Sequence, residues 1–189
     1  MSESAENHEE VILSPEEISS GVEELAHQIA GRCADDKVAF VGIYTRGVTL
    51  ARRVAEALKE QGLHFPVGTL DISLYRDDFD NRGPDLPTLE TSDIPFALDD
   101  LRVILFDEVI YTGRTIRAAL DGLMDYGRPA RIELAVLVDR GHREIPIQPD
   151  YVARRIGTTR DQYVKVRFRE DDRGKEGVFL ESPGNAPAA

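Results

Sequence analysis

A thirteen-residue segment in the middle of the chain contains residues that could bind a sugar phosphate. It consists of Val103, Ile104, Leu105, Phe106, Asp107, Glu108, Val109, Ile110, Tyr111, Thr112, Gly113, Arg114 and Thr115. The carboxylates of the adjacent acids, Asp107 and Glu108, can accept hydrogen bonds from vicinal hydroxyl groups. The Thr-Gly-Arg-Thr turn would open a helix, and the backbone N–H groups at a helix N-terminus favour an anion such as phosphate. The segment therefore predicts a carboxylate pair close to a phosphate site.

The same segment has a simpler interpretation, in which a buried strand is followed by an ordinary helix cap. An acidic pair alone would be compatible with that interpretation, but strand, acids and turn in this order favour a ligand site. Ligands of open α/β sheets bind beyond the carboxyl ends of the strands, where Asp107 and Glu108 would lie. The chain contains neither Gly-x-x-x-x-Gly-Lys nor Gly-x-Gly-x-x-Gly, which excludes a P-loop and a dinucleotide-binding fingerprint.

The elements around this segment predict an α/β domain. A capping box at Ser14 to Glu17 and apolar residues at helical spacing predict a helix that ends at Gly31. Strands alternate with helices along the rest of the chain, which favours a mostly parallel central sheet flanked by helices. The expected strands are 38–43, 67–75, 103–106, 131–138, 163–168 and 178–180, and the further expected helices are 47–61 and 114–126.

We expect one domain over residues 11–180, with disordered tails at 1–10 and 181–189. The polar stretch 76–95 contains Pro84, Pro87 and Pro95. A gap of that length inside a compact domain is more often a functional lid than filler.

The composition excludes several classes of protein. The chain has 189 residues, a net charge of −12 and one cysteine. One cysteine excludes an intramolecular disulfide and a multi-cysteine zinc site. No apolar run approaches the about 20 residues that a bilayer span needs, and no signal pattern opens the chain, so we expect a cytoplasmic protein without a membrane partner. The acidity argues against indiscriminate binding of nucleic acid, because contacts to phosphate need Lys and Arg.

The charge is unevenly distributed along the chain. Residues 128–169 contain ten basic and five acidic residues, which gives this stretch a net charge of +5. One interpretation is a solubilising surface with scattered ion pairs. The other is a surface for a phosphate-bearing partner.

Four segments together resemble a known family. The segment from Val103 to Thr115 resembles the 5-phosphoribosyl-1-pyrophosphate (PRPP) signature of the type I phosphoribosyltransferases. Residues 41–47 (Val-Gly-Ile-Tyr-Thr-Arg-Gly) resemble their pyrophosphate loop, and residues 71–78 (Asp-Ile-Ser-Leu-Tyr-Arg-Asp-Asp) resemble the strand that enters their flexible loop. Residues 137–146 (Leu-Val-Asp-Arg-Gly-His-Arg-Glu-Ile-Pro) resemble the base-side loop of one subfamily, the bifunctional pyrimidine operon attenuators and uracil phosphoribosyltransferases of the PyrR type.

The resemblance extends over residues 11–166 and implies the type I phosphoribosyltransferase fold, with a flexible lid and a small hood on the base side. It implies that Asp107 and Glu108 hold the ribose hydroxyls. The further implied contacts are the 5′-phosphate at Thr112, Gly113, Arg114 and Thr115; pyrophosphate at Thr45, Arg46 and Gly47; the lid at Tyr75, Arg76 and Asp77; and the base at Val138, Asp139 and Arg140. In relatives the pyrophosphate loop contains a strained or cis peptide, so we expect one here.

The implied reaction converts uracil and PRPP to UMP and pyrophosphate. Mg²⁺ would be bound together with PRPP, without a direct set of protein ligands. The acids are Asp-Glu where PyrR-type proteins usually have Asp-Asp, but other type I enzymes use mixed pairs, so we expect the function to be retained. Purine-specific relatives carry an acid at the position of Tyr111, so its absence favours uracil. A phosphoribosyltransferase for another base is the alternative.

The resemblance also implies a regulatory role, because PyrR-type proteins bind the leader mRNA of pyrimidine operons when UMP is bound and thereby attenuate transcription. The candidate RNA-binding residues are Arg32, His142, Arg143, Arg154 and Arg155. Residues 11–31 contain no Lys or Arg, and the polar face of their helix carries Glu23 and Glu24. A transferase without RNA regulation is therefore the alternative. The family also implies a homodimer or a higher homo-oligomer, in which two basic stretches could form one face.

Overall fold

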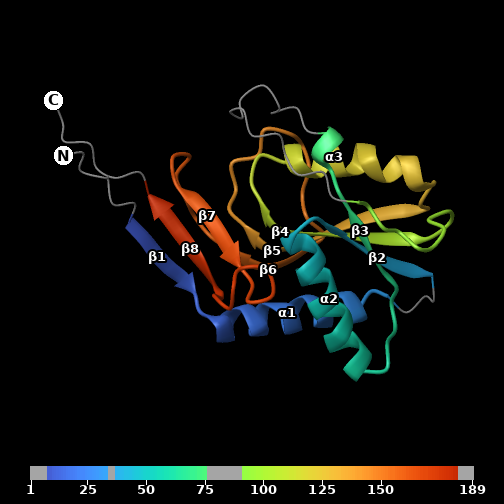
Figure 1. The fold of residues 1–189 in the computed structure, drawn as a ribbon, viewed down its shortest axis with the longest axis horizontal. Coiled ribbons are helices and arrows are strands. Elements are labelled where there is room, and N and C mark those ends of the chain that lie inside the picture. The colour runs from blue at the N-terminus through green and yellow to red at the C-terminus, as the bar shows by residue number, and fades with distance from the viewer. Residues whose placement is uncertain (1–7, 34–36, 76–90, 183–189) are drawn as a thin grey trace.

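The computed structural model describes residues 8–33, 37–75 and 91–182, and it has a parallel sheet at its centre (Figure 1). The strand order in this sheet is β3-β2-β4-β5-β6, and each neighbouring pair is parallel. The strands are β2 (Val38–Ile43), β3 (Val67–Leu70), β4 (Arg102–Ile110), β5 (Arg131–Asp139) and β6 (Tyr151–Arg155). The expected α/β class with a mostly parallel central sheet is confirmed.

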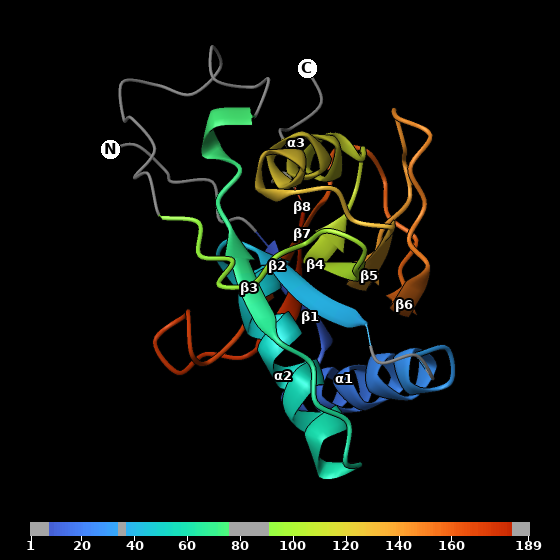
Figure 2. The same ribbon diagram turned by 90° about the vertical axis from the view of Figure 1, so that its right-hand side faces the viewer.

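Helices cover both faces of this sheet. Helices α1 (Pro15–Ala30) and α2 (Arg46–Glu60) lie on one face, and α3 (Arg114–Leu123) lies on the other (Figure 2). The central strands are apolar at successive positions because side chains alternate between two buried faces. In β4, Ile104 and Phe106 pack with α1 and α2, whereas Val103 and Leu105 pack with α3.

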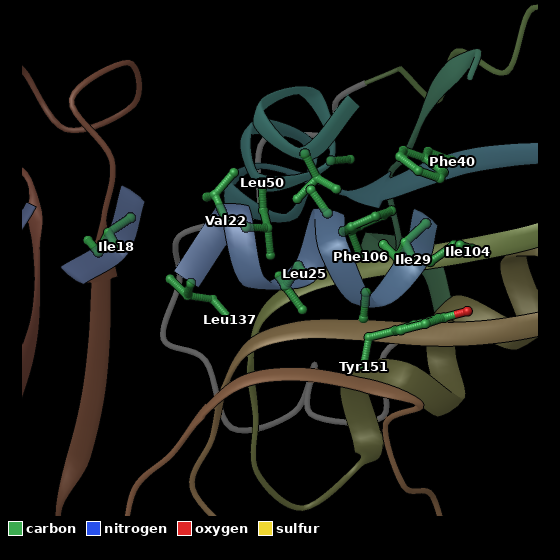
Figure 3. Close-up of a cluster of buried hydrophobic side chains, with 14 of the residues drawn as sticks. Ile18, Val22, Leu25, Ile29, Phe40, Leu50, Ile104, Phe106, Leu137 and Tyr151 are labelled. Atoms are coloured by element: carbon green, nitrogen blue, oxygen red, sulfur yellow. The ribbon is translucent and has the colours of Figure 1, made fainter. Parts of the chain in front are cut away.

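Helix α1 forms as its sequence predicts. Ser14 and Glu17 make a reciprocal capping box, in which each backbone N–H donates to the other side chain, at 3.3 and 2.8 Å. The apolar face packs on the sheet, and Figure 3 shows Ile29 beside Phe106. Each such fully buried side chain stabilises the fold by about 1.5–3 kcal/mol. Gly21 lets the helix approach closely, because a Cβ there would lie 3.0 Å from a methyl group of Leu137.

A second, antiparallel sheet contains β1 (His8–Leu13), β8 (Gly177–Ser182) and β7 (Tyr163–Arg167), in that order. This sheet is the small hood that the resemblance implies, and it projects from the end of the central sheet in Figure 1. The expected tail boundaries are wrong, because His8 pairs with Ser182 and Glu9 pairs with Glu181. Strand pairing between the two ends of the chain therefore extends the domain beyond residues 11–180.

Two further expectations about strands are wrong. Strand β4 continues four residues past its expected end at Phe106, because Asp107, Val109 and Ile110 pair with β5. The strand expected at 67–75 ends at Leu70 and is followed by a 3₁₀ turn, η1 (Ser73–Tyr75). Strands β1 and β6 lie outside the expected elements. The helix expected over 114–126 ends as α3 at Leu123 and continues as a 3₁₀ turn, η3 (Met124–Tyr126).

Within the described residues, no helix is long and apolar enough to cross a membrane.

Candidate active site

The acidic pair lies in the last part of β4, the central strand of the sheet. Asp107 is buried with 5% of its surface exposed, and Glu108 is half-buried. The backbone N–H of Glu108 donates to Oδ1 of Asp107 at 3.0 Å, which holds that carboxylate near the backbone. The acids are therefore part of β4 itself. They lie near its carboxyl end, at the edge of the sheet where the neighbouring parallel strands also end.

The loop expected to bind pyrophosphate lies directly against these acids. It joins β2 to α2, and its Tyr44–Thr45 peptide bond is cis, as expected from the resemblance. A Cβ on Gly47 would lie 2.4 Å from the carbonyl oxygen of Phe106 and 3.3 Å from the Cα of Asp107. Only glycine fits this contact, so two motifs about sixty residues apart in the sequence share one backbone junction.

Arg46, in the same loop, is held by a residue that the sequence analysis did not single out. Its Nη2 and Nε donate to the two carboxylate oxygens of Asp172, at 2.5 and 3.1 Å. The hydrogen bonds from Arg46 lower the pKa of Asp172, and the same contact raises the pKa of Arg46. Next to it, Asp171 accepts a hydrogen bond from Thr49 of α2 at 2.7 Å. The guanidinium of Arg46 and the carboxylate of Asp172 are therefore charged at neutral pH.

The Thr-Gly-Arg-Thr turn forms the start of α3, as expected. Gly113 has φ +93°, a left-handed conformation that favours glycine. The hydroxyl of Thr112 accepts from the backbone N–H of Arg114 at 3.3 Å, and the carbonyl of Thr112 accepts from Glu144 and Ile145 at 2.9 and 3.1 Å. The phosphate turn is therefore attached to the loop that follows β5.

The loop after β5 surrounds a pocket of about 360 Å³ at the end of the sheet. It is lined by Asp139, Arg140, Gly141, His142, Arg155, Ile156, Gly157 and Thr158. Arg140 is buried with 5% exposed, and its guanidinium stacks 4.0 Å from the centre of the Tyr111 ring. Burial lowers the pKa of Arg140, although the side chain donates to Thr158 Oγ1 at 3.2 Å and to the carbonyl of Thr159 at 2.9 Å. Tyr111 thus occupies the space beside the expected base site.

The comparisons with known proteins agree with this arrangement. Residues 9–173 match the family model described as the phosphoribosyl transferase domain. A protein from Roseiflexus sp. (strain RS-1), named bifunctional protein PyrR, is 52% identical over 91% of this chain and 94% of its own. A protein of the same name from Deinococcus radiodurans is 49% identical over 91% and 94% of the two chains.

The chain belongs to the PyrR family of type I phosphoribosyltransferases.

Solved structures support the fold alone. A hypoxanthine-guanine phosphoribosyltransferase from Bacillus anthracis superposes with a TM-score of 0.70 at 18% identity, over 92% of this chain and 98% of its own. A hypoxanthine phosphoribosyltransferase from Staphylococcus aureus superposes with a TM-score of 0.69 at 20% identity, over 92% and 91% of the two chains. The type I fold is therefore shared with proteins whose sequences have diverged widely from the PyrR family.

Only part of the expected lid can be described. Arg76 and Asp77 lie outside the described residues. Tyr75 is anchored on α3, because its carbonyl accepts from Arg117 at 3.0 Å and its ring would touch a Cβ on Gly122 at 3.0 Å. Tyr75 therefore contacts α3 at the point where the polar stretch begins, and its assignment to the lid stays a prediction.

The expected RNA-binding residues of this PyrR-family chain divide into two groups. Arg143 is only 12% exposed and makes an ion pair with Asp139 at 2.7 Å, so it holds the base-side loop. His142 contacts the carbonyl of Thr158 through Nε2 at 2.6 Å, in the same loop. Arg32 instead lies in the turn that follows α1, and Arg154 lies in β6, where it donates to Ser20 Oγ of α1 at 3.3 Å. Arg155 is exposed and lines the pocket of about 360 Å³ described above.

Sequence reasoning missed Asp171 and Asp172, which lie in the turn between β7 and β8. Their only sequence signal is a run of three adjacent acids, Glu170 to Asp172, and their partners on α2 lie more than 120 residues earlier. It also missed a buried network at the opposite end of the sheet. There, Glu133 is 1% exposed and accepts from Arg102, at 2.8 and 2.9 Å, and from the hydroxyl of Tyr151 at 2.7 Å. This network connects β4, β5 and β6 away from the site.

Proposed function

We propose that this chain transfers the phosphoribosyl group of PRPP to uracil, giving UMP and pyrophosphate. The contact of Gly47 with the end of β4 carries the proposal, because it holds the pyrophosphate loop against the acidic pair. The phosphate turn begins five residues after Asp107, and its carbonyl contacts connect it to the base-side loop. The pyrophosphate loop, the acidic pair and the phosphate turn thus correspond to the pyrophosphate, the ribose and the 5′-phosphate of PRPP. The base-side loop corresponds to the acceptor base.

In this mechanism Asp107 and Glu108 hold the ribose hydroxyls and stabilise the positive charge that grows on the ribose as its C1–O bond breaks. Thr112 to Thr115 hold the 5′-phosphate through backbone N–H and hydroxyl groups. Thr45, Arg46 and Gly47 hold the departing pyrophosphate, with the guanidinium of Arg46 supplying positive charge. Val138, Asp139 and Arg140 border the site of the base.

The donor set is compatible with Mg²⁺ that is bound together with PRPP. The carboxylates of Asp107 and Glu108 offer the oxygen ligands that Mg²⁺ prefers. Among residues 8–33, 37–75 and 91–182, no group of three or more His, Cys, Asp and Glu side chains is arranged to hold a metal. Most ligands would therefore come from the substrate and from water. When bound, the ion would neutralise the negative charge of the leaving pyrophosphate.

The test is an assay of the purified protein with Mg²⁺, PRPP and labelled uracil, run in parallel with hypoxanthine. We expect conversion of uracil to UMP, because Tyr111, which stacks on Arg140, stands at the position where purine-specific relatives carry an acid. Turnover of hypoxanthine without turnover of uracil would contradict the pyrimidine assignment.

We also propose that the chain binds the leader mRNA of a pyrimidine operon when UMP is bound, and so attenuates transcription in the cytoplasm. The exposed Arg32 and Arg155 and the half-buried Arg154 are its candidate contacts. RNA recognition of this kind targets loops and bulges and needs only a local basic face. The acidic, exposed Glu23 and Glu24 of α1 favour the alternative, a transferase without RNA regulation.

A titration of the cognate leader RNA with and without UMP separates these two functions. We expect UMP to tighten RNA binding in wild type, and Arg154→Gln with Arg155→Gln to weaken it. Arg128→Gln is the control for each of these two changes, because it removes one positive charge from an exposed site outside the candidate set. RNA binding that is absent at moderate salt, or independent of UMP, would leave the transferase alone. Light scattering of the same sample tests the proposed homodimer or higher homo-oligomer.

A further inference from the structure

The turn between β7 and β8, residues 168–176, is attached to one stripe of α2. Arg46, Thr49 and Arg53 are spaced three and four residues apart, so they lie on the same side of the helix. Arg46 binds Asp172, Thr49 binds Asp171, and Arg53 binds Glu170 and Glu176. The guanidinium of Arg53 also lies over the ring of Phe168, 4.7 Å from its centre. The turn thus follows the helix from its first residue, which belongs to the pyrophosphate loop.

The pair of Arg46 and Asp172 has a geometry that fixes the guanidinium. Nε and Nη2 donate to different oxygens of one carboxylate, which is the parallel, bidentate arrangement of strong charged pairs. The carboxylate is itself fixed, because its Oδ2 also accepts from the backbone N–H of Phe168 at 3.0 Å. The side chains of Arg46 and Asp172 are 32% and 14% exposed, so the contact is partly shielded from water.

We infer that Asp172 is a positioning residue, which holds Arg46 so that the guanidinium faces the pyrophosphate of PRPP. This inference rests on the proposed function. The carboxylate of Asp172 accepts hydrogen bonds from Nε and Nη2 of Arg46. The Nη1 edge of the guanidinium is then left to donate to an anion. Glu108 and Asp171 also act electrostatically on Arg46. Without Asp172, the flexible arginine can turn to these acids, which removes it from the pyrophosphate and places it on an acid of the ribose site.

A competing role for the same contact makes the opposite prediction. If Asp172 only competed with pyrophosphate for Arg46, its removal would free a positive charge and pyrophosphate would bind more tightly. If Asp172 positions Arg46, its removal weakens binding, because the loss of orientation outweighs the gain in free charge. The sign of the change therefore decides between the two roles.

The test compares Asp172→Asn with Thr49→Val. The first variant keeps the shape of the side chain and removes its charge, whereas the second removes the neighbouring attachment of the same turn without touching Arg46. Calorimetry measures the binding of pyrophosphate with Mg²⁺ and, separately, of UMP, which has no pyrophosphate. Steady-state kinetics with uracil measure the KM for PRPP, and thermal melts verify folding.

For Asp172→Asn we expect pyrophosphate affinity to fall and the KM for PRPP to rise by about tenfold, the usual effect of freeing one long side chain. The affinity for UMP should stay at the wild-type value, and Thr49→Val should behave like wild type in all three measurements. Tighter pyrophosphate binding, or equal changes in both variants, would overturn the inference. If wild type fails to turn over uracil but Asp172→Asn still weakens pyrophosphate binding, the positioning role stands and the proposed reaction is wrong.

Discussion

The contact between Gly47 and the end of β4 can be tested by adding a single methyl group. In Gly47→Ala, the new Cβ would lie 2.4 Å from the carbonyl oxygen of Phe106, whereas real Cβ contacts stay above 3.0 Å. The two segments must therefore separate by at least 0.6 Å, the difference between these distances. The oxygen belongs to the backbone of a buried strand, so a side-chain rotation cannot relieve the contact.

This separation moves the pyrophosphate loop away from the acidic pair. A displacement of about 1 Å in a positioning element can lower a rate about a hundredfold, so we expect kcat/KM for PRPP to fall about tenfold to a hundredfold. Overpacking of this kind also destabilises a fold by about 1–3 kcal/mol, which a thermal melt detects. The assay is steady-state conversion of uracil to UMP at a temperature well below the midpoint of the melt.

Gly31→Ala is the matched control for the added methyl group. Gly31 caps α1 with φ −64°, and a Cβ there would meet its nearest atom at an ordinary 3.6 Å. We expect this variant to keep wild-type kinetics and to be slightly more stable, because alanine restricts the unfolded chain. If Gly47→Ala folded and kept the wild-type kcat/KM, the loop and the acids would not be rigidly coupled, and the reasoning from this contact would be refuted.

Three other substitutions test different parts of the molecule. Asp107→Asn should abolish PRPP use while leaving the thermal melt almost unchanged; loss of the fold in place of activity would show that the acid is structural. Glu133→Gln should destabilise the fold by about 3 kcal/mol at pH 7, the low end for a buried pair, because it leaves the guanidinium of Arg102, 20% exposed, without its partner. Burial is the largest single effect and favours the protonated acid, but the hydrogen bonds from Arg102 and Tyr151 and the charges of Arg102 and Arg131 together outweigh it and lower the pKa of Glu133. This difference should therefore shrink as the pH falls below about 4; a difference independent of pH would contradict the charged pair. Arg143→Gln should raise the KM for uracil more than the KM for PRPP, because Arg143 holds the base-side loop; an effect on RNA binding alone would contradict that role.

Much of the fold follows from local patterns in the sequence. The capping box at Ser14, the apolar strands and the glycine of the phosphate turn lie where the sequence predicts them. The edge strands are less predictable, because β6 has only Tyr151 fully buried and β1 has two exposed acids, Glu9 and Glu10, directly after its first residue. Such strands are specified by their partners: β1 exists because it pairs with β8 at the other end of the chain.

The candidate site shows the same division between local and distant signals. Motifs within one segment, such as Asp107 to Thr115, are recognised from residue types and order. The role of Asp172 is not recognised in this way, because its partner Arg46 lies 126 positions earlier. No residue next to either of them in the sequence indicates the contact. Contacts of this kind depend on how the hood docks on α2, which spacing along the chain does not encode.

The basic stretch 128–169 illustrates how packing changes the meaning of a charge count. Six of its ten basic residues make ion pairs or are buried within this domain: Arg131 with Glu133, Arg140 beneath Tyr111, Arg143 with Asp139, Lys165 with Glu181, Arg167 with Glu9 and Arg169 with Glu176. The stretch is therefore mainly a source of contacts within the domain: two of these ion pairs lie inside the stretch, and three reach acids elsewhere in the chain. Its net charge of +5 does not by itself make an RNA-binding face, and the proposed RNA contacts reduce to a few arginines near β6 and the end of α1. Because Glu23 and Glu24 lie exposed on that same helix, such a face would hold RNA weakly unless its symmetry-related copy adds to it.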